Sequence, residues 1–171
     1  KWIWSNKTES DEGGLVINDP EKPIGYSIEF GINLDPHHTA TLSDDLSNGN
    51  LIPCDINGDT DNPTFTLNVG GQPYSGSFKN YPVVFPNTPA GKIAVTWSGS
   101  GFELICENDT EYATGSVSVV MKYYAKGAEK ADLFTNRVNL AIDGTTSLSD
   151  ATTIRKYDNA ALYAAKSIGD N

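Results

Sequence analysis

The strongest constraint on the fold is the alternation of apolar and polar residues in several short runs. The clearest run covers residues 24–32, where the apolar positions are Ile24, Tyr26, Ile28, Phe30 and Ile32. A period of two predicts a β-strand with one buried face. Similar runs cover residues 65–69, 93–97, 102–106 and 117–123. Strands that recur without intervening helices predict a mainly β protein, an immunoglobulin-like antiparallel β-sandwich over residues 1–125.

Turn signals separate these runs. Asn-Gly pairs at 48–49 and 57–58 border a short strand at 51–56. The Gly-rich segment 98–101 joins the runs 93–97 and 102–106, which predicts a β-hairpin. In this hairpin Cys106 shares the inward face with Phe102 and Leu104.

The pattern changes after Gly127. Phe134, Val138 and Ala141 follow a helical spacing, and Gly144 is a suitable stop signal. A second apolar series runs from Ile154 to Ile168. We therefore expect residues 126–171 to form a small helical subdomain appended to the sandwich.

Charge excludes two classes of partner. Twelve Lys and Arg residues against 22 Asp and Glu residues give a net charge of −10. Nucleic acids and anionic lipid surfaces bind basic proteins, so neither is an expected partner. No apolar run reaches the roughly 20 residues that a membrane-spanning helix needs, so membrane insertion is not expected.

The two cysteines, Cys54 and Cys106, both fall in predicted strands. The acidic composition, rich in Ser, Thr and Asn, is typical of an exported protein, and we expect these cysteines to form a disulfide. The alternative is a pair of buried free thiols.

One acidic segment resembles the start of a calcium-binding loop. Asp55, Asn57, Asp59 and Asp61 carry oxygen ligands at alternate positions. The sixth and twelfth positions hold Thr60 and Thr66 instead of Gly and Glu. The segment is therefore a weak calcium candidate, and an acidic turn with side-chain-to-backbone hydrogen bonds is favoured. Because no catalytic or nucleotide-binding motif is present, we expect neither an enzyme nor a cofactor.

Three segments resemble a known family. They are Lys1-Trp2-Ile3-Trp4, Asn50-Leu51-Ile52-Pro53 and Gly115-Ser116-Val117-Ser118-Val119. In this order they resemble the kappa-class chaperone–usher fimbrial subunits, the K-antigen type adhesive pilins of enterotoxigenic Escherichia coli. The resemblance implies an incomplete sandwich that takes its missing strand from a neighbouring pilus subunit. It also implies a periplasmic chaperone, export through the periplasm to a surface fimbria, and binding to host glycans or glycoproteins.

We expect glycan contact on residues 126–171, because that segment holds both arginines of the chain beside several aromatic residues. The expected glycan-binding residues are Phe134, Arg137, Arg155, Tyr157 and Tyr163. The alternative is that the aromatic residues of this segment pack against the sheet.

These observations together predict that the chain is a fimbrial subunit or an adhesin. Two alternatives stay open. One is a secreted carbohydrate-binding or carbohydrate-active sandwich, with or without a stabilising calcium ion, and the other is a structural β-module of a larger surface protein.

Overall fold

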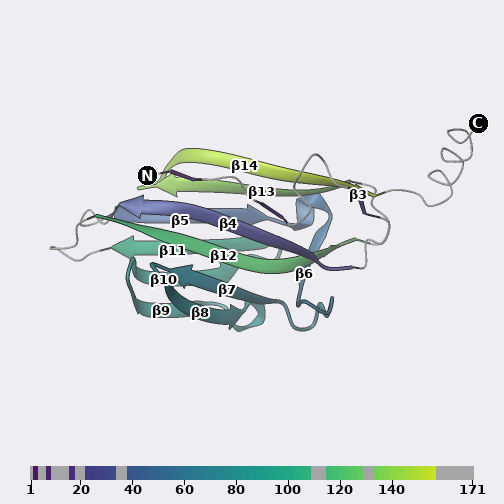
Figure 1. Cartoon of the computed structure of the whole chain (residues 1–171), viewed down its shortest axis with the longest axis horizontal. Coiled ribbons are helices and arrows are strands. Elements are labelled where there is room, and N and C mark those ends of the chain that lie inside the picture. The colour runs from purple at the N-terminus through teal and green to yellow at the C-terminus, as the bar shows by residue number, and fades with distance from the viewer. Residues whose placement is uncertain are drawn as a thin grey trace, which may run out of the picture.

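The computed structural model shows two β-sheets packed face to face (Figure 1). The structure describes residues 2–3, 7–8, 16–17, 22–33, 38–108, 115–128 and 133–156, with side chains for 22–32, 39–108, 115–128 and 134–144. The predicted antiparallel sandwich is confirmed.

The first sheet is built around two long strands, β4 and β12, and the whole of β4 pairs antiparallel with residues 116–125 of β12. Along this sheet the order is β1, β4, β12, β7 and β8, with β2 also on β4 and β6 also on β12. Its strands are β1 (Trp2–Ile3), β2 (Lys7–Thr8), β4 (Ile24–Asn33), β6 (Leu51–Cys54), β7 (Thr64–Val69), β8 (Gln72–Ser77) and β12 (Ser116–Gly127).

The second sheet follows the order β3, β14, β13, β5, β11, β10 and β9. Its strands are β3 (Val16–Ile17), β5 (His38–Asp45), β9 (Val83–Thr88), β10 (Gly91–Trp97), β11 (Gly101–Asn108), β13 (Leu133–Ile142) and β14 (Thr145–Lys156). Two short 3-10 helices, η1 (Ser47–Gly49) and η2 (Phe78–Asn80), complete the described elements. No helix in these ranges has the length and apolar character needed to cross a membrane.

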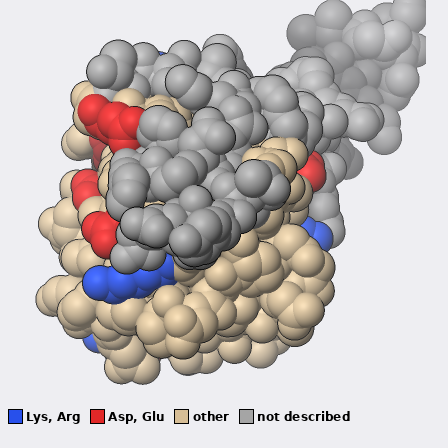
Figure 2. Space-filling model, turned by 90° about the vertical axis from the view of Figure 1, so that its left-hand side faces the viewer, with Lys and Arg blue, Asp and Glu red and all other residues tan. Residues whose placement is uncertain are grey.

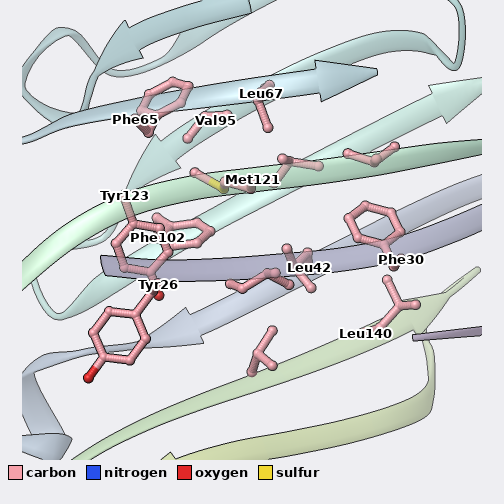
Figure 3. Packing of buried hydrophobic residues seen from close by; sticks show 14 of the residues in the cluster. Tyr26, Phe30, Leu42, Phe65, Leu67, Val95, Phe102, Met121, Tyr123 and Leu140 are labelled. Carbon is pink, nitrogen blue, oxygen red and sulfur yellow. The ribbon is translucent and has the colours of Figure 1, made fainter. Parts of the chain in front are cut away.

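The core lies between the sheets and is built from the alternating positions. In β4 the five apolar residues from Ile24 to Ile32 are all buried, and the partner strand β12 buries Val119, Met121 and Tyr123. Figure 3 shows Tyr123 beside Phe102 of the opposite sheet, and the two ring centroids are 5.3 Å apart. Burial of this apolar surface is the main term that holds the two sheets together.

The predicted hairpin is also present. Strands β10 and β11 pair antiparallel from Lys92 opposite Glu107 to Trp97 opposite Phe102. The backbone N–H of Ser98 donates to the carbonyl of Gly101 at 2.8 Å and closes the turn. As expected, Phe102, Leu104 and Cys106 are all buried on one face of β11.

The predicted helices are wrong wherever this part of the chain is described. Residues 133–156 form β13 and β14, which pair antiparallel with each other, and β13 also pairs with β5. In β13 the buried residues are Phe134, Asn136, Val138 and Leu140, which is a period of two. The polar Asn136 interrupts the apolar series, so that the remaining residues also fit a helical spacing. Residues 157–171 lie outside the described part.

The domain boundary that we placed at residue 125 falls inside β12. The strand continues to Gly127, where it pairs with Leu51 of β6. Gly127 also lies against Phe134, because a Cβ built on this glycine would be 2.4 Å from the phenyl ring. The described part of residues 126–171 therefore belongs to the sandwich itself.

Candidate functional site

The residues expected to bind glycans do not form one described surface. Phe134 is fully buried, so its ring belongs to the core and offers no exposed face, which is the alternative we left open. Arg137 lies in β13 and is exposed. Arg155 pairs with Leu133 in the backbone register of β13 and β14, and its side chain is outside the described set. Tyr157 and Tyr163 lie outside the described residues.

The expected disulfide is absent, and Cys54 and Cys106 are two buried free thiols. Cys54 lies opposite Tyr124 in the register of β6 and β12, whereas the neighbouring Tyr123 is the residue that faces the core. Directly opposed residues share a face, so Cys54 and Cys106 lie on different sides of the first sheet.

Burial changes the chemistry of both thiols. It raises the pKa of Cys54 to about 11 and that of Cys106 to about 12. The Cys106 thiol also donates to the carbonyl oxygen of Ala90 at 3.1 Å. Since the thiolate is the reactive form, neither cysteine has the properties of a nucleophile at neutral pH.

In the segment considered as a calcium site, the carboxylate oxygens of Asp55 and Asp59 accept hydrogen bonds from backbone N–H groups of the same segment. Oδ1 of Asp55 accepts the backbone N–H groups of Asn57 and Asp59, both at 2.9 Å, and Asp59 accepts the N–H of Asp61 at 2.9 Å. The hydrogen bond from the Asp59 N–H is the main cause that lowers the pKa of Asp55. This is the acidic turn favoured from the sequence. Within the described ranges, no three His, Cys, Asp or Glu side chains are placed to share a metal ion.

A polar cluster inside the sandwich is the most distinctive chemical feature of the structure. Asp44 of β5 and Asn136 of β13 come from the second sheet, and Tyr123 of β12 comes from the first. The hydroxyl of Tyr123 donates to Oδ2 of Asp44, and Nδ2 of Asn136 donates to the Tyr123 hydroxyl. All three residues are buried. The cluster therefore links the two sheets by hydrogen bonds across the core.

Burial dominates the electrostatics of this cluster. It raises the pKa of Asp44 from its ordinary value to about 8, an effect opposed by the hydrogen bond from Tyr123 and reinforced by the neighbouring Asp45. Burial also raises the pKa of Tyr123 well above its usual range, with Asp44 as the next cause. Both groups are therefore neutral over most of the physiological pH range.

The outer face of the first sheet carries a groove of about 530 Å³. We call it the β7–β8 groove. Its lining residues are Thr66, Leu67, Asn68, Pro73, Tyr74, Ser75, Val120 and Lys122. Tyr74 is directly opposed to the buried Leu67, so its ring faces the core, where it packs against Phe85 with ring centroids 5.2 Å apart. The hydroxyl groups of Thr66 and Ser75, the amide of Asn68 and the ammonium of Lys122 border the groove beside Pro73 and Val120, and such a set of groups suits a polar, uncharged or weakly acidic ligand.

Neither the cluster nor the groove was identified from the sequence. The groove takes its residues from three strands, and the pairings Lys122 opposite Thr66 and Thr66 opposite Ser75 bring them together. The sequence did contain a sign of the cluster. Ala40, Leu42 and Asp44 occupy alternate positions of β5 and are all buried, so a carboxyl group continues an apolar series. A polar residue in a buried series indicates a partner within the core, although it does not identify that partner.

The acidic composition is visible on the surface. Figure 2 shows one end of the sandwich, where Asp and Glu side chains gather along one border and Lys and Arg side chains occupy smaller areas. Most of the described surface in this view belongs to residues of neither kind. Among the described residues of this face, no broad basic surface is seen.

No protein-family model matches this chain, and no curated protein matches it. Solved structures do share its fold. The N-terminal domain of the Streptococcus gordonii adhesin Sgo0707 matches over 90% of this chain and 32% of its own length, with 9% identity and a TM-score of 0.59. BcpA, the major pilin subunit of Bacillus cereus, matches over 91% of this chain and 39% of its own, with 14% identity and a TM-score of 0.58.

The pilus backbone RrgB of Streptococcus pneumoniae also matches, over 90% of this chain and 78% of the solved chain, with 11% identity and a TM-score of 0.55. The chain spans about a third of the length of the adhesin and major pilin structures. These similarities show that the fold is one used by pilins and adhesins. They give no support to the chaperone–usher class that the sequence resemblance implied.

Proposed function

We propose that this chain is a non-catalytic β-sandwich module of a bacterial pilus subunit or surface adhesin. The observation that carries the proposal is the shared sandwich fold, which extends over about nine-tenths of the chain in both an adhesin and a major pilin. Fold similarity alone does not define function. The acidic surface and the buried, unreactive thiols are consistent support, because an exported module needs solubility and chemical inertness.

The module is proposed to act as one unit of a longer surface protein. The proposal is supported by the lengths compared: this chain matches only about a third of the length of the adhesin and pilin structures. Neighbouring modules or pilus subunits are therefore the proposed partners. The strands at one border, β8 and β9, carry Pro73 and Pro86. Proline in an edge strand opposes uncontrolled pairing with strands of other molecules. A protein displayed in many copies requires this protection.

The experiment that tests surface display is immunogold labelling of intact cells with antibodies raised against this chain. Labelled filaments support a pilus subunit, and label spread over the cell envelope supports an adhesin. Antibody absorbed with the purified chain serves as the control. Labelling that requires permeabilised cells contradicts the proposal.

Strand donation by a neighbouring subunit and a periplasmic chaperone form a finer proposal that stems from the sequence resemblance. A subunit that lacks a strand should stay aggregated or unfolded unless a chaperone or donor peptide accompanies it. The test is expression of the chain with and without a periplasmic pilus chaperone, followed by size-exclusion chromatography. A stable monomer without the chaperone contradicts strand donation, and a chaperone-bound complex supports it.

Host-glycan binding is a second finer proposal. Arg137 is exposed and Lys122 lines the β7–β8 groove, so each offers a cation to a sugar hydroxyl or carboxylate. A glycan array probed with the unmodified chain identifies any ligand. Arg137→Ala and Arg155→Ala should then reduce binding if the ligand lies on β13 and β14. Reduction by Lys122→Ala alone places the ligand in the groove instead.

A further inference from the structure

Two buried oxygen atoms of the polar cluster have no hydrogen-bond partner among the described residues. They are Oδ1 of Asp44 and Oδ1 of Asn136. The other polar atoms of these two side chains both engage the hydroxyl of Tyr123, so the carboxyl and carboxamide groups lie next to each other around one oxygen atom. Two buried acceptors side by side without a donor are unfavourable, since each has lost its hydration.

Among the described side chains, none that influences the charge of Asp44 is a cation. The electrostatic influences on it come from Tyr123 of β12 and Asp45 of its own strand. β4 contributes Tyr26, which stacks on Tyr123 with ring centroids 5.6 Å apart, and β11 contributes Phe102. β13 contributes Asn136. An ionised carboxylate can only accept hydrogen bonds, whereas a protonated one donates once and still accepts.

We propose that Asp44 is held as a neutral carboxylic acid that donates its proton from Oδ1 to Oδ1 of Asn136, and that loss of this proton acts as a pH-sensitive release of the link between the sheets. The proton completes a closed ring of three hydrogen bonds. Asp44 donates to Asn136, Asn136 donates to Tyr123, and Tyr123 donates to the second oxygen of Asp44. Each group donates once and accepts once, so both unpartnered oxygens are satisfied by one proton.

The pH range follows from the direction of the shift. Burial raises the pKa of Asp44 from 3.8 to about 8 in the folded protein, whereas the unfolded chain exposes the carboxyl to water. The folded state therefore holds one more proton than the unfolded state between these values. The stabilisation is complete below pH 4 and is lost as the pH rises through about 8. Within this range, the folding equilibrium constant falls by up to about tenfold per pH unit from this group alone.

Asp44→Asn tests the ring directly. The new carboxamide keeps the shape, can donate to Asn136 and accept from Tyr123, and cannot ionise. Urea denaturation at pH 5, 6, 7 and 8 gives the folding equilibrium constant of each protein. We expect the ratio of the variant's constant to that of the unmodified chain to rise by up to about tenfold per pH unit. Asp61→Asn is the control, because the Asp61 side chain is 94% exposed. A ratio that stays constant with pH overturns the proposal.

A second measurement does not depend on the variant. In protein labelled with ¹³C at the aspartate carboxyl carbon, the NMR chemical shift of Asp44 reports its protonation state. We expect the shift of a neutral acid at pH 6 and a titration near pH 8. The shift of an ionised carboxylate at pH 6 overturns the proposal, even if Asp44→Asn does not fold.

Discussion

Tyr123 of the first sheet donates a hydrogen bond to Asp44 of the second sheet through the middle of the core. The two sheets of a sandwich usually meet through apolar side chains that interdigitate in the core. Here a directional bond adds to them, because a hydrogen bond that crosses from sheet to sheet favours one relative placement of β5 and β12. Asn136 binds the same hydroxyl, and the link therefore involves three strands.

Replacing Tyr123 with Phe should lower the free energy of unfolding by about 1–3 kcal/mol, because Asp44 and Asn136 lose the hydroxyl that both use. Tyr124→Phe is the matched control, since Tyr124 is only half-buried on the other face of β12. That variant should change the free energy by less than about 0.5 kcal/mol. Urea denaturation measures both. Equal stability of the two variants would show that the cluster does not hold the sheets.

Phe134→Ala should destabilise the protein by about 3–5 kcal/mol, because the ring is fully buried in β13. Phe134→Leu keeps most of the volume and should cost about 1.5 kcal/mol or less, so it serves as a variant that folds. Arg137→Ala, at an exposed position of the same strand, should shift the free energy of unfolding by less than about 0.5 kcal/mol. Thermal denaturation followed by circular dichroism compares them. A large loss from Arg137→Ala would contradict the placement of β13.

Gly49→Ala should destabilise the protein by at least about 1–3 kcal/mol. A Cβ on Gly49 would lie 1.5 Å from the backbone oxygen of Thr135, and backbone cannot move aside as a side chain does. Gly25→Ala is the control, because its nearest contact is a Tyr124 ring atom at 3.4 Å. The comparison also tests the strand assignment of residues 133–142. If Gly49→Ala and Gly25→Ala have equal unfolding midpoints, β13 does not pack against η1.

Both cysteines should be recovered as free thiols and should react slowly while the protein is folded. Burial raises their pKa values to about 11 and about 12, so the thiolate is scarce at neutral pH, and little should change up to pH 9. Labelling with a thiol reagent at pH 7, followed by mass spectrometry, should show two additions in guanidinium chloride and almost none without it. A mass two units lower with no labelling in denaturant would reveal a disulfide.

Residues 24–32 illustrate what can be read from sequence alone. Their alternation predicts a strand and assigns its inward residues, and the structure buries all five of them. The hairpin of β10 and β11 is equally local, because a short Gly-rich turn places two alternating runs side by side. In both cases the alternation of apolar and polar residues along the chain is sufficient to predict the strand and its inward side chains.

Asn136 shows where local pattern stops being sufficient. A polar residue at an inward position made the series around Phe134 and Val138 compatible with a helix, and the strand is stable because β5 and β14 supply its backbone partners. Those partners are distant in sequence, so no local period identifies them.

The sequence by itself determined the class of fold, the inward faces of the regular strands and the acidic surface. Apart from the hairpin of β10 and β11, the tertiary structure alone decided which strands pair, and this pairing had three further outcomes. It placed Cys54 and Cys106 on different sides of the first sheet, assembled the β7–β8 groove, and brought Asp44 and Asn136 to one hydroxyl. The physical reason is that the period of a strand sets only the direction of its side chains. The partner of a buried polar atom depends on register and sheet packing between segments far apart in the chain.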